Sequence, residues 1–332
     1  MIGRGKSGRF SLKGLLCLVL LVEVAIVGTF AVLKNGYSPF AAQNSGAGGG
    51  TLQVKQHSNA GGSKLQITQN LWAGDIGTGG ADADTVSPVN MRPFSVPVGI
   101  VGIADTRCLE LINRSHGISM APDGGLLVHA WPSVPVSTQT IILHNAALEA
   151  VTSLFAAARE AQAGTFYVGS GYRDYEKQKE IYDSATDKSY VQPPNHSEHQ
   201  TGLAVDIFVI GIHQSMMAGS PEGRWLAENA WKYGLTLRYT EDKKKYTQIA
   251  GEPWHFRYMG QPHAWFCAQY DLCFEEYIQF LGENGGYCAL LDGKSYFVLY
   301  QSPKDGMIYV PESMDYSISN DNTGGYIVTA WE

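Results

Sequence analysis

The sequence predicts an α+β fold, in which a mainly antiparallel sheet is flanked by helices. Three observations support this prediction. One stretch places apolar side chains at the spacing of a single helical face, helical and β-prone segments are mixed along the chain, and turn residues separate short β-prone runs near the C-terminus.

The helix over 146–161 is predicted from apolar residues three and four positions apart, such as Leu148, Val151 and Leu154. Asp174 is placed to cap the helix that follows it, whereas Pro221 and Gly234 mark the start and end of another. The predicted elements are helices over 146–161, 174–184, 221–233 and 274–281 and strands over 165–170, 202–210, 235–239, 254–259, 295–300, 307–310 and 325–329.

The N-terminus predicts a membrane anchor. Four basic residues precede Gly14–Leu33, an apolar run long enough for one helical crossing, interrupted by Glu23. A cleaved signal peptide is the alternative, but no small-x-small site follows the run directly. Under either interpretation we expect the rest of the chain to be exported. A retained anchor predicts a single-pass protein of the cell membrane whose main domain is extracellular.

Composition divides the chain into four predicted parts. Residues 1–34 form a basic stub and anchor, and residues 35–95 form a flexible linker rich in Gly and Ser. A strand around Leu65–Trp72 remains an alternative for part of that linker. Residues 96–282 are predicted as the catalytic domain and 283–332 as a β-rich C-terminal extension.

Charge argues against nucleic acid as a partner. The formal net charge of the whole chain is -7. Residues 1–34 carry a net charge of about +4, so the rest of the chain is strongly acidic and lacks the basic surface that binds phosphates. Outside the predicted anchor the four cysteines are Cys108, Cys267, Cys273 and Cys288. They allow two disulfides in three connectivities, or free thiols, and the sequence does not choose between them. It also does not indicate an oligomeric state.

Two segments place metal-ligating residue types on predicted strands. In Ser197–Asp206, a carboxylate lies within an otherwise apolar strand and His199 precedes it. A buried carboxylate is costly unless a cation compensates it. In Glu252–Tyr258, His255 lies on the face opposite to the aromatic residues, and Glu252 is three residues earlier. Two histidines and one carboxylate form a zinc site with an open position for water.

The predicted metal ligands are therefore His199, Asp206 and His255, for Zn2+, with Glu252 as the general base. Arg173 ends a predicted strand, where it could hold a carboxylate or an oxyanion. Each residue also has a structural alternative. Asp206 could pair with an arginine, Glu252 could be a solvated loop carboxylate, and His196 could replace His199 as a ligand.

At these residues the chain resembles the VanY-type D-alanyl-D-alanine carboxypeptidases, zinc peptidases of the wider LAS group. The resemblance covers roughly 109–281 and rests on three motifs, which appear here as Ser170-Gly-Tyr-Arg173, Ser197-x-His199-x-x-Gly202-x-Ala204-x-Asp206 and Glu252-x-Trp254-His255-x-Arg257-Tyr258.

This resemblance implies hydrolysis of the terminal D-alanine from peptidoglycan stem peptides. It assigns His199, Asp206 and His255 to zinc and Glu252 to base catalysis. Arg173 would stabilise the transition state or anchor the substrate, and Ser197 and Gln178 would contact the terminal D-residue. An L,D-carboxypeptidase acting on tetrapeptide stems and a non-catalytic cell-wall binding module remain as alternatives.

Overall fold

The computed structural model describes residues 53–59, 62–68, 89–95 and 107–332, and side chains from residue 107 onward. These ranges belong to one compact unit, residues 50–332. Within them, no helix has the length and apolar character needed to cross a membrane. The predicted anchor, residues 14–33, lies outside the described residues, so it stays a prediction.

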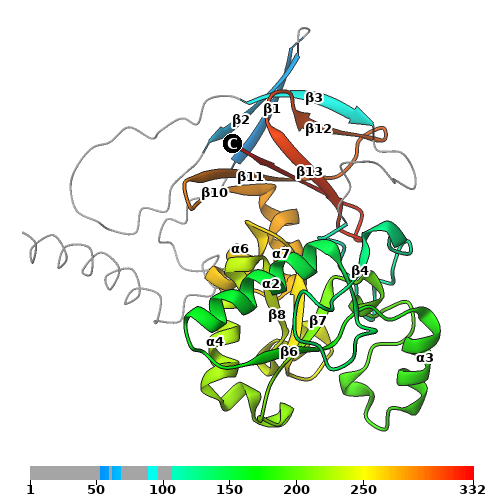
Figure 1. Ribbon diagram of the computed structural model, residues 1–332. Coiled ribbons are helices and arrows are strands. Elements are labelled where there is room, and N and C mark those ends of the chain that lie inside the picture. The colour runs from blue at the N-terminus through cyan, green and yellow to red at the C-terminus, as the bar shows by residue number, and fades with distance from the viewer. Residues whose placement is uncertain (1–52, 60–61, 69–88, 96–106) are drawn as a thin grey trace, which may run out of the picture. The chain divides into compact units, whose positions relative to one another are not determined.

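A four-stranded antiparallel sheet forms the centre of the catalytic region (Figure 1). Its order is β6–β7–β9–β8, so the outer strand β8 pairs with the last strand in sequence, β9. The strands are β6 (Phe166–Ser170), β7 (Ala204–Val209), β8 (Leu235–Tyr239) and β9 (Glu252–Tyr258). All four match predicted strands within two residues at each end, which confirms the predicted antiparallel α+β arrangement.

Helices α2 (Asn145–Glu160) and α4 (Pro221–Asn229) cover this sheet with their apolar sides. Val151 of α2 packs in one buried cluster with Val205 of β7 and Phe256 of β9. All three side chains are fully buried, and burial of such a side chain contributes about 1.5–3 kcal/mol to the stability of the fold. The sheet therefore provides a rigid base for the residues at its other face.

Caps in the sequence fix the ends of two helices. Asp174 accepts a hydrogen bond from the Lys177 backbone N–H and begins α3 (Tyr175–Ser184). The predicted helix 221–233 is divided into α4 and a 3-10 turn, 230–233, and Gly234 ends it with a φ of 80°. The remaining short elements before the C-terminal part are β4 (Leu127–His129), β5 (Ile142–His144) and α5 (Lys244–Thr247).

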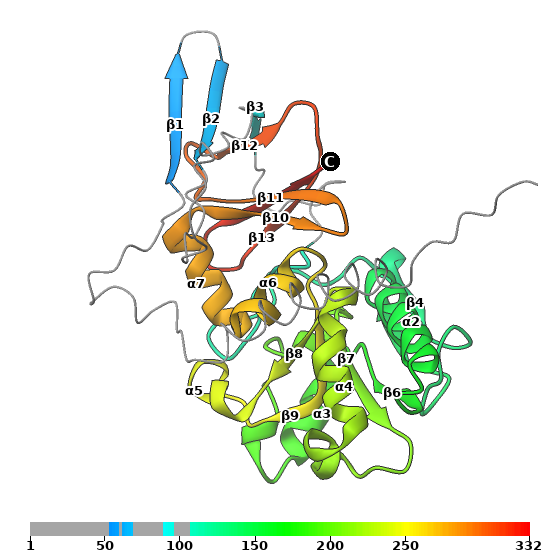
Figure 2. The same ribbon diagram turned by 90° about the vertical axis from the view of Figure 1, so that its left-hand side faces the viewer.

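The C-terminal part is a second antiparallel sheet of order β10–β11–β14–β13 (Figure 2). Two helices precede it, and their buried aromatic side chains Phe266 and Tyr277 pack in one cluster with Tyr287 of this sheet. The elements are α6 (His263–Tyr270), α7 (Phe274–Asn284), β10 (Gly286–Leu291), β11 (Lys294–Gln301), β12 (Met307–Pro311), β13 (Asp315–Asn320) and β14 (Tyr326–Trp331).

Three strands lie within 35–95, the range interpreted as a flexible linker. They are β1 (Gln53–Asn59), β2 (Gly62–Thr68) and β3 (Val89–Ser95), and β3 pairs with β12. Strand β2 includes Lys64–Thr68, whose polar and apolar residues alternate in the manner of a strand. The interpretation as a flexible linker thus does not describe these three segments, whereas the three boundaries between the four predicted parts stay predictions.

The segment 108–119 connects the two sheets. The Leu109 backbone N–H donates to Ser319 Oγ at 3.1 Å, and the Leu111 N–H donates to the Asp321 carbonyl at 3.1 Å. The Asn322 side chain donates to the carbonyls of Leu111 and Gly117 at 3.0 and 2.6 Å. The turn between β13 and β14 therefore holds this segment by several backbone contacts.

None of the four cysteines of the described residues forms a disulfide. Cys108, Cys267 and Cys273 are buried, and Cys288 is half-buried. Burial raises the pKa of the Cys273 thiol to about 12 and that of Cys288 to about 11. Both of these thiols are thus protonated at neutral pH, as expected for structural cysteines.

Candidate metal centre

The strand register brings the predicted site residues into one row across the sheet. Ser170 of β6 lies opposite Asp206 of β7, and Asp206 lies opposite His255 of β9. Facing positions on neighbouring antiparallel strands bring side chains to within about 5.5 Å. Residues 170, 206 and 255, far apart in sequence, are therefore neighbours because of the pairing alone.

His199 reaches the same point from a short 3-10 turn, 198–201, just before β7. Gly202 ends the turn with a φ of 75°, and a Cβ at this position would lie 2.9 Å from the His144 backbone nitrogen. Glycine is required here, both for the left-handed conformation and for the close approach. The His199 Nδ1–H donates to the Gly171 carbonyl at 2.7 Å, which directs Nε2 toward Asp206.

His199, Asp206 and His255 form a buried cluster whose ligand atoms all lie within 4.8 Å of one another. Asp206 Oδ1 lies 3.4 Å from His199 Nε2 and 3.2 Å from His255 Nδ1. This oxygen is buried and accepts no hydrogen bond. A buried carboxylate oxygen between two imidazole nitrogens is the donor set of a metal site, so these three residues could hold a metal ion.

The electrostatics of the cluster favour a cation. Burial by itself would raise the pKa of Asp206, but the two histidines hold it well below its usual value. Burial and the Arg173 charge lower the pKa of His199 to about 4. Burial lowers the pKa of His255 too, but the carboxylates of Asp206 and Glu198 outweigh it and raise the pKa to about 9. The same carboxylates would attract a metal ion, in competition with that proton.

Glu252 lies beside the cluster without belonging to it. Its Oε2 is 3.6 Å from His255 Nδ1, and the residue is only 6% exposed. Burial raises the pKa of Glu252 to about 8, and the charge of Asp206 acts in the same direction. A carboxyl group with a pKa near neutrality, next to a candidate metal, has the properties of a general acid and base.

Arg173 approaches the cluster from the opposite side. Its Nη2 donates to Asp206 Oδ2 at 3.1 Å and to Ser170 Oγ at 2.9 Å. Its Nη1 is 3.4 Å from Gln178 Oε1, and the Gln178 amide donates to the Gln192 carbonyl at 2.6 Å. The sequence left open that Asp206 pairs with an arginine, and the structure contains this ion pair in addition to the cluster. The Arg173 side chain keeps 19% of its surface exposed.

The two other residues considered from sequence take different places. Ser197 is buried at the start of the turn that carries His199, and its hydroxyl does not cap that turn. His196 points away, with Nδ1 2.8 Å from the Asn113 carbonyl oxygen. It is not part of the three-residue cluster, so the geometry favours His199 over His196 as the ligand.

Sequence reasoning missed a second layer of charge behind His255. Glu198 is 1% exposed, with Oε1 2.8 Å from Arg238 Nε and 3.1 Å from Arg257 Nη1. Arg238 also donates two hydrogen bonds to Glu275, at 2.7 and 2.9 Å. The sequence did contain one signal for this layer. Glu198 is a charged residue between Ser197 and His199, in a segment that has to be buried if it carries a metal ligand.

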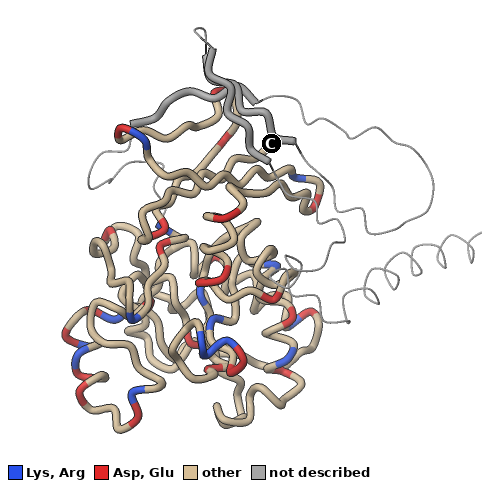
Figure 3. The backbone as a smooth tube through the Cα atoms, turned by 180° about the vertical axis from the view of Figure 1, so that it is seen from behind, with Lys and Arg blue, Asp and Glu red and all other residues tan. Residues whose placement is uncertain are grey.

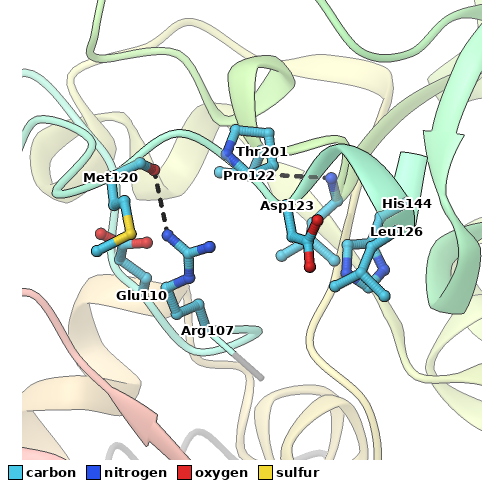
Figure 4. A pocket seen from close by; sticks show the side chains of 9 residues that line it. Arg107, Glu110, Met120, Pro122, Asp123, Leu126, His144 and Thr201 are labelled. Atoms are coloured by element: carbon cyan, nitrogen blue, oxygen red, sulfur yellow. Dashed lines mark hydrogen bonds between the residues drawn. The ribbon is translucent and has the colours of Figure 1, made fainter. Parts of the chain in front are cut away.

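A separate small pocket lies on another side of the turn that carries His199 (Figure 4). Its volume is about 40 Å³, room for a few water molecules and not for a peptide. Arg107 points into it and donates to the Met120 carbonyl. Its lining residues are Arg107, Glu110, Met120, Pro122, Asp123, Leu126, His144, Thr201 and Leu203. None of these residues belongs to the metal-ligand cluster.

Acidic and basic residues are interspersed along the described part of the chain (Figure 3). Several of these charges are inside the fold, since Glu198, Asp206, Arg238, Glu252 and Arg257 are all buried. Buried charges require partners, and the partners found here converge on the cluster.

Comparison with known proteins matches the part of the chain that contains these residues. The profile of the VanY family, described as D-alanyl-D-alanine carboxypeptidase, matches residues 140–261. This range holds every residue considered above as a ligand, base or substrate contact. The solved structure of the vancomycin-resistance D,D-dipeptidase VanXYg, in complex with a D-Ala-D-Ala phosphinate analogue, superposes with a TM-score of 0.61 at 28% identity, covering 73% of this chain and 99% of that one.

Two curated relatives extend the comparison. A D-alanyl-D-alanine carboxypeptidase of Enterococcus faecium is 40% identical over 167 residues, which are 50% of this chain and 54% of the relative. The chain thus spans about half the length of that protein. The protein YodJ of Bacillus subtilis (strain 168) is 33% identical over 183 residues, 52% of this chain and 67% of the relative. The chain therefore belongs to the VanY family of D-alanyl-D-alanine carboxypeptidases.

Proposed function

We propose that this chain is a zinc-dependent D,D-carboxypeptidase that removes the terminal D-alanine from peptidoglycan stem peptides. The observation that carries the proposal is the buried cluster of His199, Asp206 and His255, with Asp206 Oδ1 between the two imidazoles and Glu252 3.6 Å from His255. Two imidazoles and one carboxylate, with a free glutamate beside them, are the donor set and base of a zinc peptidase.

The residues divide the chemistry between them. Zinc bound by the three ligands supplies Lewis acidity and lowers the pKa of water to about 7. Glu252 takes a proton from the attacking water while the water oxygen bonds to the carbonyl carbon of the peptide bond that is cleaved. Glu252 then returns the proton to the amine of the departing D-alanine when the C–N bond breaks. Arg173 stabilises the negative charge that develops on the carbonyl oxygen, or holds the substrate carboxylate.

The comparisons support this substrate class. The Enterococcus faecium relative is named for D-alanyl-D-alanine, and VanXYg was solved with a phosphinate analogue of D-Ala-D-Ala. Peptidoglycan lies outside the cell membrane, so we propose the same location for this chain, held there by the predicted N-terminal anchor.

The test is release of D-alanine from a pentapeptide stem and from a tetrapeptide stem by the purified full chain, with its zinc content measured. Zinc-dependent release from the pentapeptide would support the proposal. Release from the tetrapeptide alone would make the enzyme an L,D-carboxypeptidase. Zinc binding without release from either stem would instead favour a cell-wall binding module.

Arg173→Lys is expected to lower kcat/KM for the pentapeptide by about 10²-fold. A lysine ammonium cannot keep the contacts of the guanidinium with Ser170 and Asp206 and also stabilise negative charge on the substrate. Steady-state kinetics would measure the effect. Arg159→Lys is the matched control, since Arg159 is exposed in the last turn of α2 and should retain full activity. Equal kinetics for the two variants would remove Arg173 from the mechanism.

A further inference from the structure

Glu198 occupies a position from which it can control one of the proposed metal ligands. Its side chain is fully buried, and its two oxygens have different partners. Oε1 faces two guanidinium groups, Arg238 at 2.8 Å and Arg257 at 3.1 Å. Oε2 faces His255 Nε2 at 3.4 Å. Glu198 is not among the positions of the family motifs that the sequence shares.

The arginines leave Glu198 little freedom. Arg238 is fixed on its other side by two hydrogen bonds to Glu275, and Glu275 also accepts from the Asn113 amide at 3.1 Å. Arg257 is completely buried and donates to the carbonyls of Cys108 and Glu110 at 3.0 and 3.2 Å. Both guanidinium groups are therefore held in place, and so is the carboxylate between them.

The two histidines present different nitrogens to Asp206. His199 faces it with Nε2, and its Nδ1 is held by a neutral backbone carbonyl, that of Gly171. His255 faces it with Nδ1, and its Nε2 is directed to the Glu198 carboxylate. A neutral imidazole carries one proton, so the group at Nε2 decides whether the Nδ1 lone pair is free for a metal ion.

We propose that Glu198 is a positioning residue that holds the His255 proton on Nε2 and so keeps Nδ1 available to the metal. The inference rests on the proposed function, in that it takes the cluster as a zinc site. Groups that orient a metal-bound histidine in this way typically change metal affinity by 10–100-fold when they are removed.

Glutamine at position 198 would reverse the arrangement while keeping the size of the side chain. Two guanidinium groups require an acceptor, so the amide oxygen would face Arg238 and Arg257. The amide NH2 would then face His255 Nε2, which would have to accept a hydrogen bond. The imidazole proton would move to Nδ1, where it blocks the nitrogen that faces Asp206.

The test compares Glu198→Gln with the unchanged full chain by competition for zinc against a fluorescent chelator. We expect the variant to bind zinc 10–100-fold more weakly. Glu275→Gln is the matched control, because it removes a carboxylate from the same arginine, Arg238, without touching His255. Its zinc affinity should stay within about 3-fold of the unchanged chain. Equal losses in both variants, or no loss in a folded Glu198→Gln protein, would overturn the proposal.

A second measurement needs no variant and covers the case in which Glu198→Gln does not fold. Two-bond 1H–15N spectra of the zinc-loaded chain report which ring nitrogen of each histidine carries the proton. Protonated Nε2 on His255 supports the proposal, and protonated Nδ1 refutes it. Absence of zinc binding by the unchanged chain would instead refute the proposed function, so the two failures are distinguishable.

Discussion

Glu252→Gln is expected to lower kcat for D-alanine release by about 10³-fold while leaving zinc binding intact. Glutamine keeps the size of the side chain, but its amide cannot take a proton from water. Because the Glu252 side chain is buried beside the cluster and is not one of the three predicted ligands, its loss should affect the chemistry and spare the metal. Rapid-mix kinetics and zinc analysis of the same preparation would measure both quantities.

Glu241→Gln provides the matched control for this prediction. Glu241 is an exposed carboxylate that accepts a hydrogen bond from the Gly251 N–H, one residue before Glu252. Its replacement changes the charge near the site without changing the proposed base. A Glu252→Gln enzyme with more than about a tenth of the original kcat would exclude Glu252 from proton transfer.

His199→Gln is expected to abolish zinc binding at micromolar metal, and activity with it. The substitution removes one of three ligands and leaves Asp206 Oδ1 with a single imidazole neighbour, His255. Equilibrium dialysis with zinc would measure the loss directly, before any assay of catalysis.

The neighbouring His196→Gln variant is the control. It shows whether zinc binding is lost because a ligand is removed or because any substitution in this loop disturbs the site. His196 lies three residues earlier and contacts the Asn113 carbonyl, outside the cluster. We expect it to bind zinc as the unchanged chain does. The reverse result, with zinc lost in His196→Gln and kept in His199→Gln, would assign the ligand to His196.

The strands of the antiparallel sheet and the residue types of the ligand cluster were predictable from local patterns, whereas strand pairing brings the cluster together. Alternating residues along 204–209 place Asp206 on one face, and Pro221 and Gly234 mark helix boundaries. The helix over 263–270 was missed because apolar residues occupy most of its positions, exposed ones included, so the sequence shows no amphipathic period. Strand β13, with its polar residues Asp315, Ser317, Ser319 and Asn320, gave no apolar run to detect.

The charge layer behind His255 was not predictable for a different reason. Arg238, Arg257 and Glu275 come from three elements, β8, β9 and α7, whose contact depends on the tertiary fold. A single charged residue in a sequence is most often solvated. Only the packing shows that Glu198 is enclosed by two arginines and a histidine, and the sequence pattern carries no information about that enclosure.

The contacts of segment 108–119 with the β13–β14 turn affect how such enzymes can be recombined. A chimera that exchanged residues 283–332 alone would separate Ser319 and Asn322 from the backbone groups of Leu109, Leu111 and Gly117. It would also open the apolar cluster that α6 and α7 share with β10, β11 and β14. The exchangeable unit is therefore discontinuous in sequence: a functional crossover has to transfer the C-terminal sheet together with β3, α6, α7 and residues 107–119. Residues 107–119 approach the proposed metal centre through Arg257.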